Sequence, residues 1–229
     1  MKVAVMQPYF FPYIGYWQLI NAVDTFVIYD DVNFIKKGYI NRNNILLNNK
    51  PHRVTLELSG ASQNKLINEI YLGSNMQSLL KTIEQSYSKS PCFNNVYGLL
   101  EKIMLVEEES LALFLENLIK SISSYIGIDT KFIRSSNLNK DNNLRGQDKI
   151  LQICQILNAD AYINAIGGID LYNKKTFEDS SITLNFIDTQ IVEYKQFNNE
   201  FTPHLSIIDI LMFNSVKQIQ EMLSNYRLV

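Results

Sequence analysis

Near its start the chain reads Val3-Ala-Val-Met-Gln-Pro-Tyr-Phe-Phe-Pro-Tyr-Ile-Gly-Tyr-Trp-Gln18. The apolar run 3–5 is typical of a buried strand, and the stretch after it is too rich in Pro, Gly and aromatic residues for a helix or an ordinary strand. We expect a helix over about 15–22 and a second apolar strand over 24–29. Together they predict a βαβ unit, in which ligands bind where the first strand ends. The loop residues expected at that ligand edge are Gln7, Tyr9, Pro12, Gly15 and Tyr16.

An alternative is that these aromatic side chains only pack beneath a tight turn. However, seven aromatic residues lie between Tyr9 and Phe26, which is more than one turn needs for its core. This density favours a ligand site, with rings such as Tyr9 and Tyr16 stacking on a base or a sugar face.

A polar segment follows the second predicted strand. Two adjacent carboxylates, Asp30 and Asp31, fall where this strand ends, on the same sheet edge as the Gln7 loop. Cationic and amide side chains follow, and they are suited to binding a phosphate or a carboxylate. Arg42 could make two parallel hydrogen bonds to such a group, and Lys36 or Lys37 could act as a point charge. The alternative is a solvated polar loop. These later candidates are Lys36, Lys37, Asn41, Arg42 and Asn43.

A second strand, loop and helix follow much later in the chain. A strand is predicted over 130–134, a long polar loop over 135–146, and a helix over 147–157. Ser135 and Ser136 are placed to donate hydrogen bonds to a phosphate, and Lys149 falls in the first helical turn, near any anion bound there. A loop of this length is often a functional lid, and disorder is the competing interpretation.

The remaining elements are read from periodicity. Strands are expected over 51–58 and, more briefly, over 66–71, and a helical subregion is expected over about 76–126. A last strand over 162–166 leads into a turn at Gly167-Gly168, where the backbone can approach a ligand closely. Candidate binding residues in that turn are Gly168, Asp170 and Tyr172.

His204 is a candidate catalytic base because an imidazole titrates near neutral pH. A structural alternative applies to the residues beside it, with Ser206 as a helix N-cap and Asp209 completing a capping box. No spacing of His, Cys or carboxylates suggests a metal site, and neither a Walker loop nor a nucleophile elbow is found.

Composition indicates a cytoplasmic globular protein. Hydrophobic residues make up 46% of the 229 residues and charged residues 19%, with a formal net charge of −2, which gives no indication of nucleic-acid binding. The two cysteines, Cys92 and Cys154, are far apart and are expected to be buried in a reducing compartment. No segment has the run of about 18 apolar residues that a membrane helix needs.

Taken together, Gln7-Pro8-Tyr9, Asp30-Asp31-Val32 and Arg42-Asn43 resemble the WbqC-like protein family. Weaker matches follow in the same order as in the family, and the resemblance extends to about residue 215. One departure is that the family usually has a Gly soon after the position of Asn214, where this chain has Ser215 and Val216. The later matches are at residues 146–149, 153–154, 161–162, 168, 172 and 205–211.

The resemblance implies a single α/β domain over residues 1–229, with a mainly parallel sheet, flanking helices and a helical insertion. The opening resembles in outline the Rossmann-like start of nucleotidyltransferases such as pantothenate synthetase, although Tyr13 and Tyr16 stand where their signature His is expected. Members of the family often belong to O-antigen and other surface-polysaccharide gene clusters.

We therefore expect an enzyme that transfers an acyl or aminoacyl group, such as glycyl, to the amino group of a nucleotide-linked amino sugar. In this hypothesis Lys37, Arg42 and Lys149 bind phosphates, and Asp30 or Asp31 orients the amine or the sugar hydroxyls. The acyl donor and the oligomeric state stay open, and ATP is a candidate cofactor. Two alternatives are a glycosyltransferase that uses a nucleotide sugar and a protein that binds sugar nucleotides without catalysis.

Overall fold

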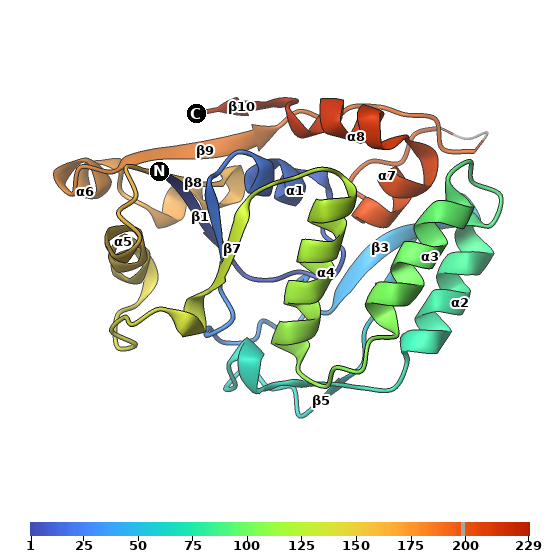
Figure 1. Cartoon of the computed structure of the whole chain (residues 1–229), viewed down its shortest axis with the longest axis horizontal. Helices are drawn as coiled ribbons and strands as arrows, with labels where there is room; N and C mark the ends of the chain where they lie inside the picture. The colour runs from blue at the N-terminus through green and yellow to red at the C-terminus, as the bar shows by residue number, and fades with distance from the viewer. Residues whose placement is uncertain (198–199) are drawn as a thin grey trace.

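A six-stranded sheet runs through the molecule (Figure 1). The computed structural model describes residues 1–197 and 200–229. From one edge to the other the strands are β10 (Tyr226–Leu228), β9 (Thr183–Thr189), β8 (Ala161–Ala165), β1 (Lys2–Met6), β2 (Thr25–Ile28) and β7 (Lys131–Arg134). All neighbours pair in parallel except β10, which is antiparallel to β9. The chain runs outward from β1 to β7, then returns to β8 on the other side of β1, so the predicted Rossmann-like α/β fold is confirmed.

Strand β1 lies in the middle of the sheet because both of its faces are apolar. Val3 and Val5 contribute to one hydrophobic core, and Ala4 between them contributes to the other. In β2, Val27 belongs to the same core as Val3 and Val5, and its neighbours Phe26 and Ile28 belong to the other core. A parallel strand covered on both faces needs this continuous apolar run, which is why the first strand was predictable.

Helices cover both faces of the sheet (Figure 1). The smaller core packs beneath α5 (Gly146–Ile156) and α6 (Lys174–Asp179). The larger core packs beneath α1 (Ile14–Asn21), α7 (Ile207–Phe213) and α8 (Val216–Leu223), and it continues into the predicted helical subregion. That subregion consists of α2 (Met76–Tyr87), α3 (Phe93–Met104) and α4 (Leu111–Tyr125).

A β-hairpin outside the central sheet was not predicted. It pairs β3 (Arg42–Leu47) with β4 (Lys50–Thr55) in an antiparallel ladder. Its turn residues, Asn48 and Asn49, both have positive φ, of 51° and 61°, as a two-residue hairpin turn requires. Residues 42–43, which the sequence analysis placed in a polar loop, therefore begin a strand.

Two further expectations about strands were wrong. The segment expected as a strand over 66–71 is mainly the 3-10 helix Ile67–Glu69, followed by β6 (Tyr71–Leu72), which pairs with β5 (Leu58–Ser59). The strand over residues 161–165 is not the last one, because β9 and β10 follow it.

This chain lacks the glycine that the family usually has soon after the position of Asn214, and here α7 ends and α8 begins. Asn214 has an extended backbone with φ of −126°, and it ends α7 without needing a left-handed residue. Ser215 then caps α8, and its backbone N–H donates to the Gln218 side chain in a capping box. The family departure therefore changes the residues of this turn and leaves both helices intact.

A buried carboxylate fastens α7 to its surroundings. Asp209 is fully buried and accepts hydrogen bonds from Tyr87 Oη (2.8 Å), Tyr194 Oη (2.6 Å) and Gln196 Nε2 (2.6 Å). Burial raises the pKa of Asp209, and the three donors oppose that rise. Ser206 caps the helix as expected, but Asp209 does not complete a capping box because its carboxylate binds these three side chains instead.

We predict that Asp209→Ala lowers the free energy of unfolding by about 2–4 kcal/mol, because three buried donors would lose their acceptor. Urea denaturation at pH 7 measures the change. The control is Asp129→Ala, which removes an exposed carboxylate and should stay within about 0.5 kcal/mol of the wild type. Equal losses in the two variants would contradict a role for the Asp209 network.

Candidate functional site

Residues that follow β2, residues at the start of α5 and residues that follow β8 line a cavity of about 310 Å³ on the side of the sheet that α5 covers. We call it the α5 crevice. Because β2 and β7 pair with Ile28 opposite Arg134, the segments that follow these two strands emerge side by side. The residues of the α5 crevice that carry polar groups are Tyr29, Asn33, Arg145, Gln147, Lys149 and Tyr172.

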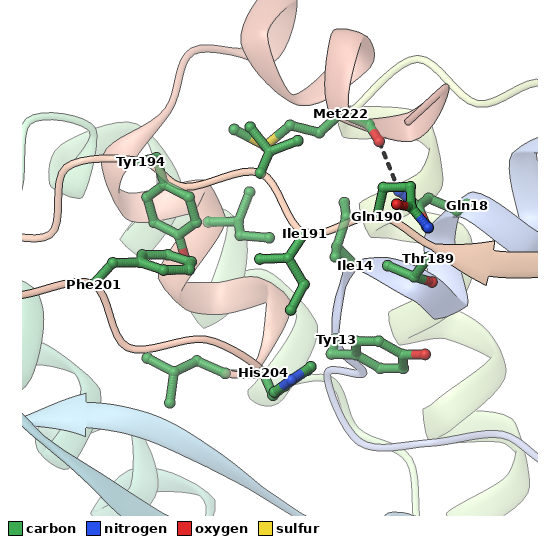
Figure 2. A pocket seen from close by; sticks show the side chains of 13 residues that line it. Tyr13, Ile14, Gln18, Thr189, Gln190, Ile191, Tyr194, Phe201, His204 and Met222 are labelled. Atoms are coloured by element: carbon green, nitrogen blue, oxygen red, sulfur yellow. Dashed lines mark hydrogen bonds between the residues drawn. The ribbon is translucent and has the colours of Figure 1, made fainter. Parts of the chain in front are cut away.

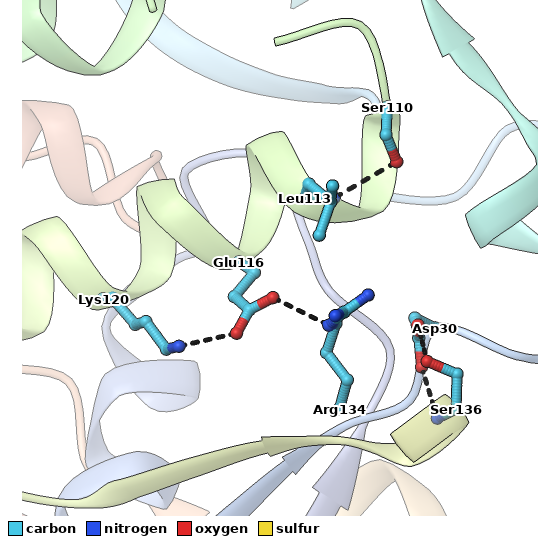
Figure 3. Close-up of polar contacts among 7 residues, drawn as sticks. All are labelled: Asp30, Ser110, Leu113, Glu116, Lys120, Arg134 and Ser136. Carbon is cyan, nitrogen blue, oxygen red and sulfur yellow. Dashed lines mark hydrogen bonds and ion pairs between the residues drawn. The ribbon is translucent and has the colours of Figure 1, made fainter.

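Asp30 joins the ends of two strands. It is fully buried, and its carboxylate accepts hydrogen bonds from the backbone N–H (2.9 Å) and the hydroxyl (2.6 Å) of Ser136 (Figure 3). The Asp30 carbonyl also accepts the backbone N–H of Asn68. Asp30 and Ser136 therefore hold the sheet edge together, and neither lines the α5 crevice.

Arg134, the last residue of β7, faces a different neighbour. Its Nε lies 3.0 Å from Glu116 Oε2, and Lys120 Nζ lies 2.6 Å from the other oxygen of that carboxylate (Figure 3). Ser110 caps the N-terminus of the same helix, α4. This network attaches β7 to α4.

Asp31 makes a buried ion pair that the sequence analysis did not anticipate. Its Oδ2 lies 2.5 Å from Lys140 Nζ, and the two side chains are only 10% and 1% exposed. Lys140 also donates to the carbonyl of Ser135. The 135–146 loop is therefore fastened to the end of β2. Within the described part of the chain, Asp31 Oδ1 and Ser135 Oγ are buried without a hydrogen-bond partner.

Lys149 lies in the wall of the α5 crevice, and its ammonium faces the Tyr29 ring. It is 4% exposed, and its Nζ lies 5.6 Å from the centre of the Tyr29 ring. Among residues 1–197 and 200–229, no carboxylate forms a salt bridge with it and no acceptor hydrogen-bonds to it. Burial lowers the pKa of Lys149; Lys140 and Arg145 add to this effect, and Asp31 opposes it.

Lys149 belongs to the first turn of α5, whose N-terminus opens on the same cavity. Arg145 and Gly146 line the α5 crevice, and Arg145, the N-cap residue, has no side-chain cap bond within the described residues. Free backbone N–H groups at a helix start attract anions. These N–H groups, Arg145 and the Lys149 ammonium are groups that could bind an anion, and Asp148 places one negative charge in the same first turn.

Two tyrosines form the opposite part of the crevice. The pKa of Tyr29 is raised to about 12, mainly by burial and then by Asp31 and Tyr172. Tyr172 Oη lies 3.3 Å from Tyr162 Oη. Gly168 permits this turn, because a Cβ there would come within 2.7 Å of Asn164 Nδ2. Asp170 is exposed and is not part of the crevice lining.

The aromatic residues of the N-terminal motif form a cluster of their own. Tyr16 is buried, and its hydroxyl donates to the Gln7 carbonyl at 3.0 Å. The Tyr9 ring packs 5.5 Å from the Tyr16 ring and 6.0 Å from that of Tyr39. Gln7, Tyr9 and Tyr16 do not line the α5 crevice, and the buried Tyr16 ring offers no free face for stacking.

The polar residues around the hairpin also serve the fold. Asn43 Nδ2 donates to the carbonyls of Phe10 (3.1 Å) and Phe11 (2.7 Å), which holds the N-terminal loop in place. Asn41 and Arg42 likewise donate to backbone carbonyls, those of Leu56 and Gly38. The two lysines of this segment, Lys36 and Lys37, are exposed. None of these candidate residues lines the α5 crevice.

His204 lines a different cavity, on the side of the sheet covered by α1, α7 and α8 (Figure 2). It is exposed, has a positive φ of 60°, and its ring lies 6.5 Å from that of Tyr13. This second cavity, the Gln18 cavity, shares no lining residue with the α5 crevice. Its polar lining includes Tyr13, Gln18, Thr189, Gln190, Tyr194 and His204. The structure thus separates His204 from Asp30 and Asp31.

Four of the six polar residues that line the α5 crevice were not among the candidates from the sequence: Tyr29, Asn33, Arg145 and Gln147. Lys140, which pairs with Asp31, was not a candidate either. Arg145 and Lys149 stand four residues apart across the predicted helix start, and this spacing was the available signal. The described residues contain no group of three His, Cys, Asp or Glu side chains that could hold a metal ion. No described helix is long and apolar enough to span a membrane.

We predict that Lys140→Met lowers the free energy of unfolding by about 3–5 kcal/mol, because it leaves the Asp31 carboxylate buried and unpaired. Chemical denaturation at pH 7 measures this loss. Lys131→Met, at the start of β7, is the matched control because that lysine is exposed. If the two variants lose the same stability, the buried ion pair does not support the loop.

Lys149→Met should have the opposite effect and raise stability modestly at pH 7, because it removes a partly desolvated ammonium whose pKa is lowered by burial. The pKa of Lys149 in the folded protein lies below the ordinary 10.5, so the folded state binds fewer protons than the unfolded state between those values. The wild type should therefore gain stability relative to Lys149→Met as the pH rises through that window. A loss of stability in Lys149→Met at pH 7 would contradict a desolvation cost at Lys149.

Comparison with known proteins places this chain in a family. It is 28% identical over 215 residues, 92% of each chain, to the protein named "Uncharacterized protein Rv1507c" from Mycobacterium tuberculosis (strain ATCC 25618 / H37Rv). No solved structure matches the chain. The sequence model of the WbqC-like protein family matches residues 7–221, and the chain therefore belongs to the WbqC-like protein family.

Proposed function

We propose that the protein is an enzyme of surface-polysaccharide precursor synthesis. It transfers an acyl or aminoacyl group, such as glycyl, to the amino group of a nucleotide-linked amino sugar. The observation that carries the proposal is Lys149, a largely buried side chain in the wall of a cavity at the carboxyl edge of a Rossmann-like sheet, whose ammonium has no salt bridge or hydrogen bond to the described residues. A bound anion would supply the partner that this ammonium lacks.

The diphosphate of the nucleotide would bind at the N-terminus of α5. Backbone N–H groups of the first helical turn can donate to phosphate oxygens, and the helix dipole favours negative charge there. Arg145 can bind a phosphate through two parallel N–H bonds, and Lys149 acts as a point charge within the cavity. At about 310 Å³, the α5 crevice has the size of a small-molecule site.

The acceptor sugar would lie between the phosphates and the two tyrosines. The rings of Tyr29 and Tyr172 offer surfaces for a sugar or a base. Asp31 lies near enough to Lys149 to oppose the lowering of its pKa. During transfer, the neutral amine nitrogen attacks the acyl carbonyl, the bond from that carbonyl to the leaving group breaks, and the proton that the nitrogen loses passes to the leaving group or to water.

Asp30 and Asp31 already have partners within the protein, and this favours acyl transfer over the glycosyltransferase alternative. In that alternative, Asp30 and Asp31 would hold a metal-bound diphosphate. Here Asp30 accepts two hydrogen bonds from Ser136, and Asp31 pairs with Lys140. The acyl donor stays open, and ATP is a candidate for activating it, since its phosphates suit the same cationic crevice.

We predict that a UDP- or dTDP-linked 4-amino sugar stabilises the protein, by about 2.7 kcal/mol at 100 times its dissociation constant. Lys149→Met should abolish that stabilisation, and Lys131→Met, which removes an exposed lysine at the start of β7, should retain it. Thermal shift across a panel of ATP, hydroxyl-sugar nucleotides and amino-sugar nucleotides measures both effects.

Mass spectrometry of the products then separates the reactions. Acyl transfer leaves the nucleotide on the sugar and adds the mass of the acyl group, whereas glycosyl transfer releases the nucleotide. Binding that depends on Lys149, with no product from any tested acyl donor, would favour the sugar-nucleotide-binding alternative. Stabilisation that is the same in Lys149→Met and the wild type would contradict the proposed site.

A further inference from the structure

The Gln18 cavity has the features of a second binding site, on the opposite side of the sheet from the α5 crevice. Its volume is about 30 Å³, whereas one buried water needs roughly 10–15 Å³ by the same kind of measure. It therefore has room for a ligand of a few heavy atoms. Exposed His204 and half-exposed Ile191 belong to its lining and give access from solvent.

Gln18 presents an unused hydrogen-bond acceptor. The residue is fully buried, and its Nε2 donates to the carbonyls of Met222 (2.8 Å) and Asn225 (3.1 Å) (Figure 2). Because these two carbonyls require the amide nitrogen on their side, the orientation of the amide is determined. Its Oε1 is buried without a hydrogen-bond partner in the described part of the chain. The missing partner is therefore a donor.

The rest of the cavity also favours a donor ligand. Figure 2 shows Tyr13 and Thr189 close together, Gln18 beside Met222, and the rings of Tyr194 and Phe201 on the other side of the cavity. Gly15 leaves room for this arrangement, because a Cβ there would come within 2.5 Å of Thr189 Oγ1 and would meet the Tyr13 hydroxyl.

The lining also offers neutral hydrogen-bond acceptors to a ligand that donates hydrogen bonds. No Asp, Glu, Lys or Arg is among the described residues that line the Gln18 cavity. Gln190 uses its Nε2 on Asp188, which leaves its side-chain oxygen as another acceptor. Aromatic faces and neutral oxygen acceptors suit an ammonium or amide group. Apolar neighbours, Ile14 and Ile191, suit a short carbon substituent.

We infer that the Gln18 cavity binds a compact primary amine or amide, with one N–H of the ligand donating to Gln18 Oε1. The inference is independent of the proposed function, because the two cavities share no lining residue.

Methyl NMR of the isoleucine-labelled full chain tests the inference, with methylammonium and formamide as probes. At least one probe should shift the Ile14 and Ile191 methyl signals saturably, and Ile35 and Ile169, which are exposed elsewhere, should not respond. Tetramethylammonium at equal ionic strength lacks an N–H donor and should produce no saturable shift. If neither probe gives saturable shifts, or tetramethylammonium gives the same ones, the cavity holds only water and the inference is wrong.

Two variants assign the binding to this cavity. Gln18→Leu removes the acceptor and should weaken binding about tenfold. Because Gln18 also holds the carbonyls of Met222 and Asn225, Ile191→Phe is a second variant that fills the cavity from its exposed side and leaves those hydrogen bonds intact. It should remove the saturable shift of Ile14. Undiminished binding in a folded Ile191→Phe protein would overturn the inference.

Discussion

Lys140 carries a positive charge that is almost completely removed from water, and the architecture of the carboxyl edge depends on it. Its ammonium pairs with Asp31 after β2 and donates to the Ser135 carbonyl after β7. A buried ion pair of this kind contributes little net stability, but the loss of one partner is strongly destabilising. A change at Asp31 or Lys140 should therefore disturb the loop that follows β7. Because this loop leads to Arg145 and the start of α5, the ion pair helps to position the cationic groups there.

Much of the fold could be predicted because it follows from local patterns. The apolar runs of β1 and β2, the loop between β1 and α1, and the helical periodicity of α2 to α4 each carry their own signal. The β3 strand was missed because Arg42, Asn43 and Asn44 make its first half polar. The Asn43 side chain bonds to loop carbonyls that are more than 30 residues away in sequence, and no local pattern contains that information.

The candidate site was predictable as an edge of the sheet and much less as a set of residues. Strand order places the ends of β2 and β7 side by side, and the segment after β8 reaches the same cavity from the other side of β1. The tertiary structure then gives the polar residues different roles. Asp30, Ser136 and Asn43 are used for internal hydrogen bonds, whereas Lys149 lies in a cavity wall without a salt bridge to the described residues. Composition alone cannot distinguish a charge that has a buried partner from one that does not.

We propose that the cationic groups at the start of α5 receive the phosphates of a nucleotide-linked sugar. A crystal structure of the protein with a UDP- or dTDP-linked 4-amino sugar tests this most directly. We expect phosphate oxygens within hydrogen-bond distance of Lys149 Nζ and of backbone N–H groups in the first turn of α5, with the sugar toward Tyr29 and Tyr172. An ordered nucleotide bound elsewhere, with the α5 crevice empty, would contradict it.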